Sequence, residues 1–376
     1  MTIIVVGAGL AGGTAVTELR DRGYDGRLIL IGSESHPPYE RPPLSKGYLL
    51  GNDPIEDALV HEERWYAEHD VDFRPSTTVT GLDPAAHRVT AGGETLGYDK
   101  LLLATGSTPR TFRLAEEAGT PTAYLRTIED SDRLKVAFAA GAKIVVVGAG
   151  WIGLEVTAAA RGAGCEVTVF EQAELPLVGV LGPEIAQVFA DLHRAHGVDL
   201  RLGTPVTADD LAAADLVVVG IGVAPNTELA ETAGLQVDDG VLVDAQLRTS
   251  DPDVYAVGDI ANHDHPTLGR RVRVEHWETA IEQAKTAAHN LAGAAEPYER
   301  LPYFFTDQYD LGMEYVGSVG PDGYDRVDVD GDLSSVVTDQ GSFRAFWVKD
   351  GTVVAALHVN DWDASEVIRE SIGTRR

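Results

Sequence analysis

Two stretches, Ile3-Ile-Val-Val-Gly-Ala-Gly-Leu-Ala-Gly12 and Ile144-Val-Val-Val-Gly-Ala-Gly-Trp-Ile-Gly153, decide the fold of this 376-residue chain. Each begins with β-branched residues, continues into the pattern GxGxxG and leads into a helix-compatible stretch. A second apolar run comes next, Leu28 to Ile31 in the first copy and Val167 to Phe170 in the second. Strand, glycine turn, helix and strand make one βαβ unit, so the chain is predicted to contain two such units.

The glycines of this pattern have separate physical roles. The first permits a tight turn, the second lets the backbone approach a pyrophosphate, and the third lets the helix pack on the strand. The helix then directs free N–H groups and the positive end of its dipole at the phosphates. One such pattern is weak evidence, but two in matching contexts favour two dinucleotide sites over glycine turns without a ligand. The predicted binding residues are Gly7, Gly9, Leu10, Ala11 and Gly12 in one copy and Gly148, Gly150, Trp151, Ile152 and Gly153 in the other.

An acidic residue about 20 positions after each glycine turn is expected to bind a ribose. In the second copy this residue is Glu171, directly after a predicted strand. Its carboxylate would accept hydrogen bonds from the adenosine 2′-OH and repel a 2′-phosphate, so NADH is favoured over NADPH. In the first copy the strand is followed by Ser33 and Glu34, and either residue could take the role.

Composition narrows the classes of function. The formal net charge of −29 disfavours binding to nucleic acid or to an anionic membrane. Cys165 is the only cysteine, which excludes an intramolecular disulfide framework, a CxxC redox pair and a cysteine-ligated cluster within this chain. The first strand begins at once, without a signal peptide, and no apolar run approaches the ~20 residues of a membrane span. We therefore expect a cytoplasmic protein.

Further apolar runs complete the predicted architecture. Three of them suit parallel strands buried on both faces, namely Leu101-Leu-Leu-Ala-Thr-Gly106, Leu216-Val-Val-Val-Gly-Ile-Gly222 and Val254-Tyr-Ala-Val-Gly-Asp259. The last ~75 residues differ, with shorter strands expected at Tyr303 to Gln308, Val336 to Val337, Phe343 to Val348 and Val353 to His358. The predicted fold class is α/β, with two Rossmann-type dinucleotide-binding domains and a C-terminal α+β domain.

Four motifs outside the glycine turns add a family resemblance: Tyr39-Glu-Arg-Pro-Pro-Leu-Ser-Lys46, Ala104-Thr-Gly-Ser-Thr-Pro109, Tyr255-Ala-Val-Gly-Asp259 and Glu275-His-Trp277. With them the sequence resembles the FAD-dependent ferredoxin reductases that serve bacterial oxygenases and cytochrome monooxygenases, within the pyridine-nucleotide reductase superfamily. The resemblance extends through essentially the whole chain. It implies FAD and NADH as cofactors and a [2Fe–2S] ferredoxin as the electron acceptor.

The resemblance also implies roles for single residues. Lys46 would lie beside the flavin N5 and pair with Glu155 across two domains, since a buried lysine without a partner tends to lose its charge. The alternative is that both are ordinary surface charges. Asp259 would bind the ribityl-phosphate region of the flavin, and Gly222 is counted with the NAD site. The other FAD contacts that the resemblance implies are Arg41, Val79, Ala104, Thr105, Gly106, Arg126, Gly258, Glu275, His276 and Trp277.

Two positions depart from the family pattern. Ser33 stands where the family usually has aspartate, so the ribose contact passes to Glu34 or weakens. Phe305 stands where relatives often carry tryptophan, near the place where nicotinamide stacks in such enzymes. We therefore expect Phe305 to alter the binding of NAD.

The resemblance implies a division into three domains and a reaction. Residues 1–109 and 232–300 would bind FAD, residues 110–231 would form an inserted NAD-binding domain, and residues 301–376 would form the C-terminal domain. A hydride would pass from NADH to FAD, and single electrons would then pass to the ferredoxin. Lys46 and Glu155 are the catalytic candidates, and no covalent nucleophile is needed.

Alternatives stay open for function and partner. One is an NADH oxidase or dye-reducing enzyme without a dedicated partner, and another is a redox-sensing protein similar to apoptosis-inducing factor. Ferredoxins are usually acidic, as this chain is, so we hypothesise a local basic docking surface drawn from Arg270, Arg271, Arg273, Arg344 and Lys349. No metal site is predicted, because the HxH of His263 and His265 lies in an expected loop. Both a monomer and a homodimer fit the sequence.

Overall fold

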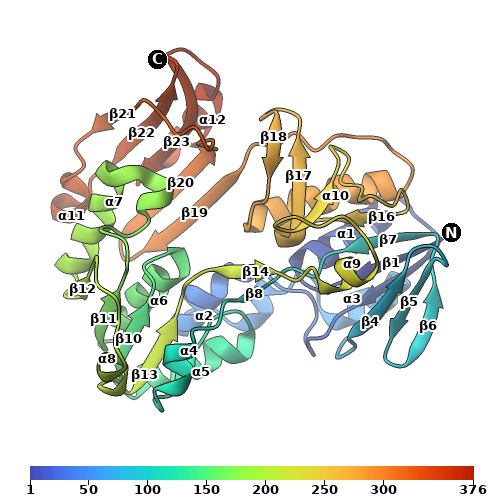
Figure 1. Ribbon diagram of the computed structural model, residues 1–376, viewed down its shortest axis with the longest axis horizontal. Coiled ribbons are helices and arrows are strands. Elements are labelled where there is room, and N and C mark those ends of the chain that lie inside the picture. The colour runs from blue at the N-terminus through green and yellow to red at the C-terminus, as the bar shows by residue number, and fades with distance from the viewer. The chain divides into compact units, whose positions relative to one another are not determined.

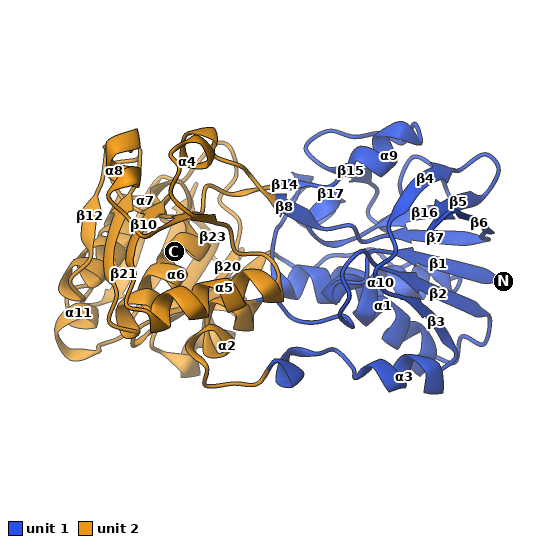
Figure 2. Ribbon diagram, turned by 90° about the horizontal axis from the view of Figure 1, so that it is seen from below, with its two compact units in different colours: residues 1–41, 55–108, 224–301 blue, residues 42–54, 109–223, 302–376 orange.

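The computed structural model describes residues 1–376, and these form two compact units (Figures 1 and 2). Three chain segments make up each unit. Unit 1 comprises Met1–Arg41, Ile55–Thr108 and Ala224–Leu301, and unit 2 comprises Pro42–Pro54, Pro109–Val223 and Pro302–Arg376. Two of the points at which the chain passes between the units fall in β8 (Ser107–Pro109) and β14 (Val223–Pro225).

Unit 1 is built on a parallel sheet with the strand order β16-β7-β1-β2-β3. Ile3, Ile4 and Val5 of its central strand are fully buried, as expected for a parallel strand covered on both faces. Ile4 lies opposite Ile29 of one neighbour and Leu101 of the other. The strands are β1 (Thr2–Val6), β2 (Arg27–Ile31), β3 (Val71–Arg74), β7 (Lys100–Leu103) and β16 (Val254–Ala256).

Helix α1 (Leu10–Asp21) begins directly after the first glycine turn and packs against α10 (Trp277–Leu291) (Figure 1). The buried Ala15, Val16 and Leu19 recur at the spacing of one helix face. Two small sheets and short helices complete unit 1: β4 (Val79–Asp83), β5 (Arg88–Ala91), β6 (Glu94–Gly97), β15 (Val241–Val243), β17 (Ala261–His265), β18 (Arg270–Val272), α3 (Glu63–Glu68), α9 (Glu228–Thr232), η2 (Ile55–Ala58) and η3 (Gly258–Ile260).

Unit 2 repeats this architecture with the parallel order β12-β11-β10-β13-β9. Helix α6 (Trp151–Gly162) follows the second glycine turn, as α1 follows the first. The strands are β9 (Thr122–Ala123), β10 (Lys143–Val147), β11 (Glu166–Phe170), β12 (Asp199–Arg201) and β13 (Leu216–Val219). The other elements of this part are η1 (Pro42–Ser45), α2 (Gly47–Leu50), α4 (Arg113–Glu117), α5 (Ile128–Ala139), α7 (Val178–Ala195) and α8 (Ala208–Ala212).

The C-terminal part of unit 2 is an antiparallel sheet with the order β19-β20-β23-β22-β21. Its apolar face carries the fully buried Trp347, in the same hydrophobic core as Leu154 of α6 and Phe189 of α7. This shared core explains why the sheet and the second parallel sheet form one compact unit. The elements are β19 (Tyr303–Gln308), β20 (Leu311–Gly317), β21 (Arg326–Gly331), β22 (Phe343–Lys349), β23 (Thr352–Val359), α11 (Ser335–Asp339), α12 (Ser365–Ser371) and η4 (Trp362–Ala364).

The predicted strand at Val336 to Val337 is wrong. Both residues lie in α11, which packs against α7, and Val336 is buried in the core of unit 2. Two β-branched residues are too short a run to separate a strand from a helical turn. The prediction also omitted β20 and β21, whereas β19 begins and ends at the expected residues.

The segment Pro42–Pro54 groups with unit 2, although it interrupts two segments of unit 1. Its Leu49 lies in the core of unit 2, and the Tyr48 hydroxyl donates to Asp132 Oδ1 of α5 at 2.7 Å. Ser131 of α5 donates to the Leu44 carbonyl at 2.9 Å. The compact units therefore do not follow the three predicted domain boundaries. The three-domain division stays a prediction, because packing alone does not define which residues belong to each dinucleotide-binding fold.

Candidate dinucleotide and redox site

In the first glycine turn, a side chain at Gly7 or Gly12 would clash with the protein itself, whereas a side chain at Gly9 would not. Gly7 has a φ of +111°, and a Cβ there would lie 2.1 Å from the Ala104 carbonyl oxygen. A Cβ on Gly12 would lie 1.9 Å from the Gly7 carbonyl oxygen. Gly9 has ordinary extended backbone (φ −86°), and a Cβ there would meet nothing within 4 Å. The glycine at this position is therefore explained by a group from outside the chain that approaches the backbone.

The second turn repeats the same pattern. Gly148 has a φ of +99°, and a Cβ there would lie 2.4 Å from the Gly220 carbonyl oxygen. A Cβ on Gly153 would lie 2.1 Å from the Gly148 carbonyl oxygen. At Gly150 the nearest atom, the Gly220 carbonyl oxygen, would be 3.9 Å away. Neither α1 nor α6 has a side-chain N-cap or an acidic residue in its first turn, so both helix starts suit an anionic pyrophosphate.

The predicted residues of unit 1 come together at one edge of the parallel sheet. Gly7 follows β1, Glu34 follows β2, Thr105 follows β7 and Asp259 follows β16, and these strands are neighbours. The carboxyl ends of parallel strands are where such folds bind their ligands. The structure thus gathers the FAD candidates Ser33, Glu34, Ala104, Thr105, Gly106, Gly258 and Asp259 around the first glycine turn.

Two of these acids have well-defined partners. Glu34 accepts hydrogen bonds from Arg41 Nη2 at 2.8 Å and from the Tyr39 hydroxyl at 2.5 Å. Asp259 Oδ2 accepts from the Ser107 hydroxyl at 2.6 Å. Tyr39 and Ser107 were not predicted as site residues, although both lie inside the motifs that were recognised. The ribose contact by Ser33 or Glu34 stays a prediction.

The remaining FAD candidates of unit 1 lie around the start of α10 and in β4. His276 is the N-cap of α10 and accepts from the Glu278 N–H at 3.2 Å, and Trp277 is the first residue of the helix. Glu275 pairs with Arg273 at 2.5 Å. Val79 begins β4 and packs against the core of unit 1. Arg126 belongs to unit 2, where its N–H donates to Asp130 Oδ2 at 3.0 Å.

Glu171 lies directly after β11, beside the second glycine turn. Its Oε2 accepts from the Ala149 N–H at 2.7 Å, and its Oε1 accepts from the Ala173 N–H at 2.9 Å. These bonds hold the carboxylate against the turn and leave each oxygen a second lone pair. This is the place from which it could accept hydrogen bonds from a ribose bound at that turn. Gly222 has a φ of +93° and follows β13, the strand next to β10.

The partly exposed Lys46 and the buried Glu155 form an ion pair inside unit 2, with 2.6 Å between Nζ and Oε1. The pairing that the resemblance implies is present, and both residues belong to one compact unit. That the pair joins two dinucleotide-binding domains stays a prediction, together with the domain division. Glu155 also accepts from the Ser45 hydroxyl at 2.5 Å and from the Thr306 hydroxyl at 2.6 Å. Lys46 Nζ lies 5.5 Å from the centre of the Phe305 ring. Ser45 and Thr306 were missed, and only their places next to Lys46 and Phe305 could have suggested them.

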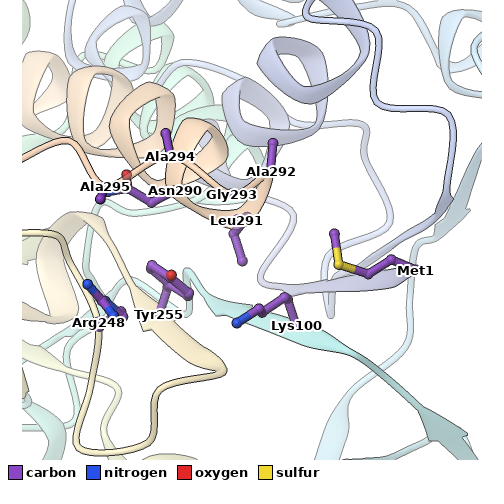
Figure 3. Close-up of a pocket in the computed structure, with 10 residues that line it drawn as sticks. All are labelled: Met1, Lys100, Arg248, Tyr255, Asn290, Leu291, Ala292, Gly293, Ala294 and Ala295. Carbon is purple, nitrogen blue, oxygen red and sulfur yellow. The ribbon is translucent and has the colours of Figure 1, made fainter.

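Unit 1 contains a cavity of about 310 Å³ that is lined by none of the predicted site residues (Figure 3). Its lining includes Met1, which precedes β1, Lys100, which begins β7, and Tyr255 in β16. Met1 and Lys100 mark the edge of the sheet opposite the glycine turn. Lys100 is paired with Asp253 at 2.5 Å. The cavity is therefore not the dinucleotide site.

Three further residues that the sequence analysis considered, Cys165, His263 and His265, are all buried. Cys165 is fully buried in the core of unit 2, and burial raises the pKa of its thiol. His263 and His265 are buried, with 5.2 Å between ring centres, and burial lowers the pKa of both. No helix is both long and apolar enough to cross a membrane.

Arg271, Arg273, Arg344 and Lys349, which belong to the hypothesised docking surface, have partners within their own units. Arg273 pairs with Asp239 and Glu275, Arg344 pairs with Asp361, and Lys349 pairs with Asp325. Arg271 donates to the carbonyls of Val243 and Asn262. The hypothesis of a basic docking surface stays a prediction, and the structure gives it no added support.

Comparison with known proteins assigns the family. The family model described as pyridine nucleotide-disulphide oxidoreductase matches residues 1–284, and the model described as reductase C-terminal matches residues 303–376. The chain belongs to the pyridine nucleotide-disulphide oxidoreductase family. This membership confirms the predicted superfamily, the fold class and an oxidoreductase that uses FAD and NADH.

Reductases of ferredoxin and of putidaredoxin are among the relatives and solved structures to which the chain is similar. The chain is 41% identical to the ferredoxin–NAD(+) reductase component of the anthranilate 1,2-dioxygenase system of Burkholderia cepacia, over 95% of this chain and 90% of the relative. It is 36% identical to putidaredoxin reductase of Pseudomonas putida, over 95% and 88%. A solved covalent complex of putidaredoxin reductase with putidaredoxin matches with a TM-score of 0.91 and 35% identity, over 100% of this chain and 94% of that one.

Proposed function

We propose that this chain is an NADH-dependent flavoprotein reductase that delivers electrons to a [2Fe–2S] ferredoxin serving an oxygenase. The observation that carries the proposal is the duplicated turn in which Gly9 and Gly150 could each carry a Cβ without a clash, while the flanking glycines are required by the protein itself. Two such turns in one chain provide one pyrophosphate-binding site for each dinucleotide. The ferredoxin reductases among the relatives support the identity of the acceptor.

The chain's own residues would bind and orient the two dinucleotides. The start of α1 would hold the FAD pyrophosphate, with Asp259 and its Ser107 partner at the same sheet edge. The start of α6 would hold the NADH pyrophosphate, and Glu171 would accept from the adenosine ribose and disfavour a 2′-phosphate. When bound, FAD can accept a hydride and release electrons one at a time.

Lys46 is the cation that we propose for the redox centre, and Glu155 compensates its charge. Glu155 is 5% exposed and balances the ammonium at 2.6 Å. Ser45 and Thr306 donate to the two carboxylate oxygens, so the anion keeps its hydrogen bonds without water. We propose Lys46 and Glu155 as the catalytic pair. Phe305 next to this pair would contact the nicotinamide.

The proposal includes the finer assignments that rest on the same sites. The FAD-binding domain would comprise residues 1–109 and 232–300, the NAD-binding domain residues 110–231, and the C-terminal domain residues 301–376. The acidity of the ferredoxin, the cytoplasmic location and the choice between monomer and homodimer stay predictions.

The test follows the electrons from NADH to distinguish a ferredoxin reductase from an NADH oxidase and from a redox-sensing protein. The purified chain, loaded with FAD, is mixed with NADH and a [2Fe–2S] ferredoxin, and absorbance changes of the ferredoxin are followed together with oxygen uptake. We expect fast ferredoxin reduction with negligible oxygen consumption. Oxygen consumption without a need for ferredoxin would indicate an NADH oxidase. Slow turnover combined with NADH-dependent dimerisation in sedimentation would indicate a redox-sensing protein.

A further inference from the structure

Three buried polar side chains of unit 2 lie on one side of Glu155, and only Thr306 among them has a role in the proposal so far. Thr306 is 0% exposed, Gln308 is 1% exposed and His193 is 0% exposed. Thr306 and Gln308 lie in β19, and His193 lies in α7. Buried polar groups destabilise a fold unless they are hydrogen-bonded, so their partners show what the fold uses them for.

Their hydrogen bonds form one continuous chain that starts at Glu155. Thr306 Oγ1 lies 2.6 Å from Glu155 Oε1, and Gln308 Nε2 lies 3.1 Å from Thr306 Oγ1. His193 Nε2 lies 2.9 Å from Gln308 Oε1. The Tyr309 hydroxyl lies 3.3 Å from His193 Nδ1, and the partly exposed His196 stacks on the Tyr309 ring. The chain thus extends from the ion pair to the surface of unit 2.

The charge on Glu155 fixes the direction of every bond. Paired with Lys46, the carboxylate carries no proton, so Thr306 must donate its only hydrogen to it. The lone pairs of Thr306 then require an N–H from Gln308, which turns the Gln308 carbonyl oxygen toward His193. An amide oxygen only accepts, so the proton of the neutral imidazole must be on Nε2. His193 Nδ1 is then an acceptor for the Tyr309 hydroxyl.

We propose that Thr306, Gln308 and His193 are positioning residues that act as a one-way chain of donors and hold the Glu155 carboxylate, and through it Lys46, in place. The role of the Lys46–Glu155 pair rests on the proposed function, whereas the direction of the chain does not. Each donor polarises the next, which strengthens the bond that reaches the carboxylate. Burial lowers the pKa of His193 to about 4, which keeps the ring neutral as the chain requires.

The test reads the position of the proton on His193. The full-length protein with bound FAD is labelled with ¹⁵N-histidine, and long-range proton–nitrogen correlation spectra report the tautomer of each of its 11 histidines. The His193 signals are assigned by their loss in His193→Gln. We expect an Nε2–H tautomer that does not change between pH 5.5 and pH 8. The titratable groups facing His193 are Tyr309 and His196, with Arg161 near Tyr309.

Variants then test the link to Glu155. In Glu155→Gln the new amide can donate to Thr306, so the chain can reverse and His193 should acquire a measurable Nδ1–H population. Thr306→Val should also change the His193 signals, and Thr306→Ser should restore them. Ser45→Ala removes a hydroxyl from the other carboxylate oxygen and should leave His193 unchanged.

Two outcomes would overturn the proposal. One is an Nδ1–H tautomer, or a titration between pH 5.5 and pH 8, in the unaltered protein, which needs no variant to fold. The other is a folded Glu155→Gln protein with an unchanged His193 spectrum. Neither outcome depends on NADH oxidation, so failure here is distinct from failure of the ferredoxin reductase assignment.

Discussion

The Lys46 ammonium lies 2.6 Å from the Glu155 carboxylate, with the lysine side chain 19% exposed and the glutamate 5% exposed. The two groups come from distant segments, and both pack inside unit 2. A buried charge is tolerated when an opposite charge and hydrogen bonds replace water. The pair is therefore a structural requirement as well as the proposed catalytic feature, and the two roles can be tested separately.

Removing one partner should be more harmful than removing both. Glu155→Ala leaves Lys46 without its counterion, and we expect the free energy of unfolding to fall by about 3 kcal/mol. The double replacement Lys46→Met with Glu155→Leu should recover part of this loss, because no charge is then left unpaired. Urea unfolding of the three proteins measures both effects. A Glu155→Ala protein as stable as the exposed control Glu166→Ala would show that the pair is not buried in solution.

Alanine at the glycines of α6 should separate ligand binding from folding. Gly150→Ala introduces a Cβ whose nearest neighbour, the Gly220 carbonyl oxygen, is 3.9 Å away, so the fold should persist while the affinity for NAD⁺ falls at least tenfold, about 1.4 kcal/mol. Gly153→Ala should destabilise the protein, because its Cβ would collide with the Gly148 carbonyl. Gly162→Ala, at the end of the same helix with nothing near its Cβ, is the matched control for both measurements. Calorimetric titration with NAD⁺ measures the affinity, and thermal unfolding measures the stability. Normal NAD⁺ binding by Gly150→Ala would show that the second glycine turn does not bind NAD⁺.

The preference for NADH should depend on Glu171. Its carboxylate is held at the glycine turn by two backbone N–H groups, where a 2′-phosphate would be repelled. Glu171→Ala should lower the ratio of kcat/KM for NADH to that for NADPH by about tenfold or more, which corresponds to about 1.4 kcal/mol. The neighbouring Glu174 is exposed, and Glu174→Ala should leave the ratio unchanged. If Glu171→Ala keeps the preference for NADH over NADPH, other residues must determine that preference.

Stability should fall as the pH decreases from about 6.5 to about 4. Burial lowers the pKa of both His193 and His263 to about 4, below the value of about 6.5 expected in the unfolded chain. The unfolded state therefore binds more protons in this interval, and the stabilisation present above pH 6.5 is lost as the pH falls. Urea midpoints measured across this range should decrease, and less steeply in His263→Gln. An exposed-histidine variant, His69→Gln, should keep the slope of the parent. Equal slopes in all three proteins would mean that His263 is not buried as a neutral ring.

The sequence predicts the features that depend on local chemistry. The glycine turns, β1, β10 and β19 follow from short patterns. At the turns, the contact of Gly12 with Gly7 and that of Gly153 with Gly148 are local, whereas the contacts of Gly7 with Ala104 and of Gly148 with Gly220 are not. The short helix α11 was mistaken for a strand, because only the core beneath Val336 decides the outcome. Likewise, Ser45 and Thr306 become recognisable only when β19 and the segment before α2 meet at α6. The grouping of residues 42–54 with unit 2 also depends on packing, through Leu49.

The occupancy of the two glycine turns tests the central claim most directly. Native mass spectrometry of the purified chain, before and after addition of NAD⁺, counts the dinucleotides bound to each molecule. We expect one FAD in the purified protein and one further NAD⁺ on addition, with the second lost in Gly150→Ala. A chain that folds but retains neither dinucleotide after refolding with both would contradict the account.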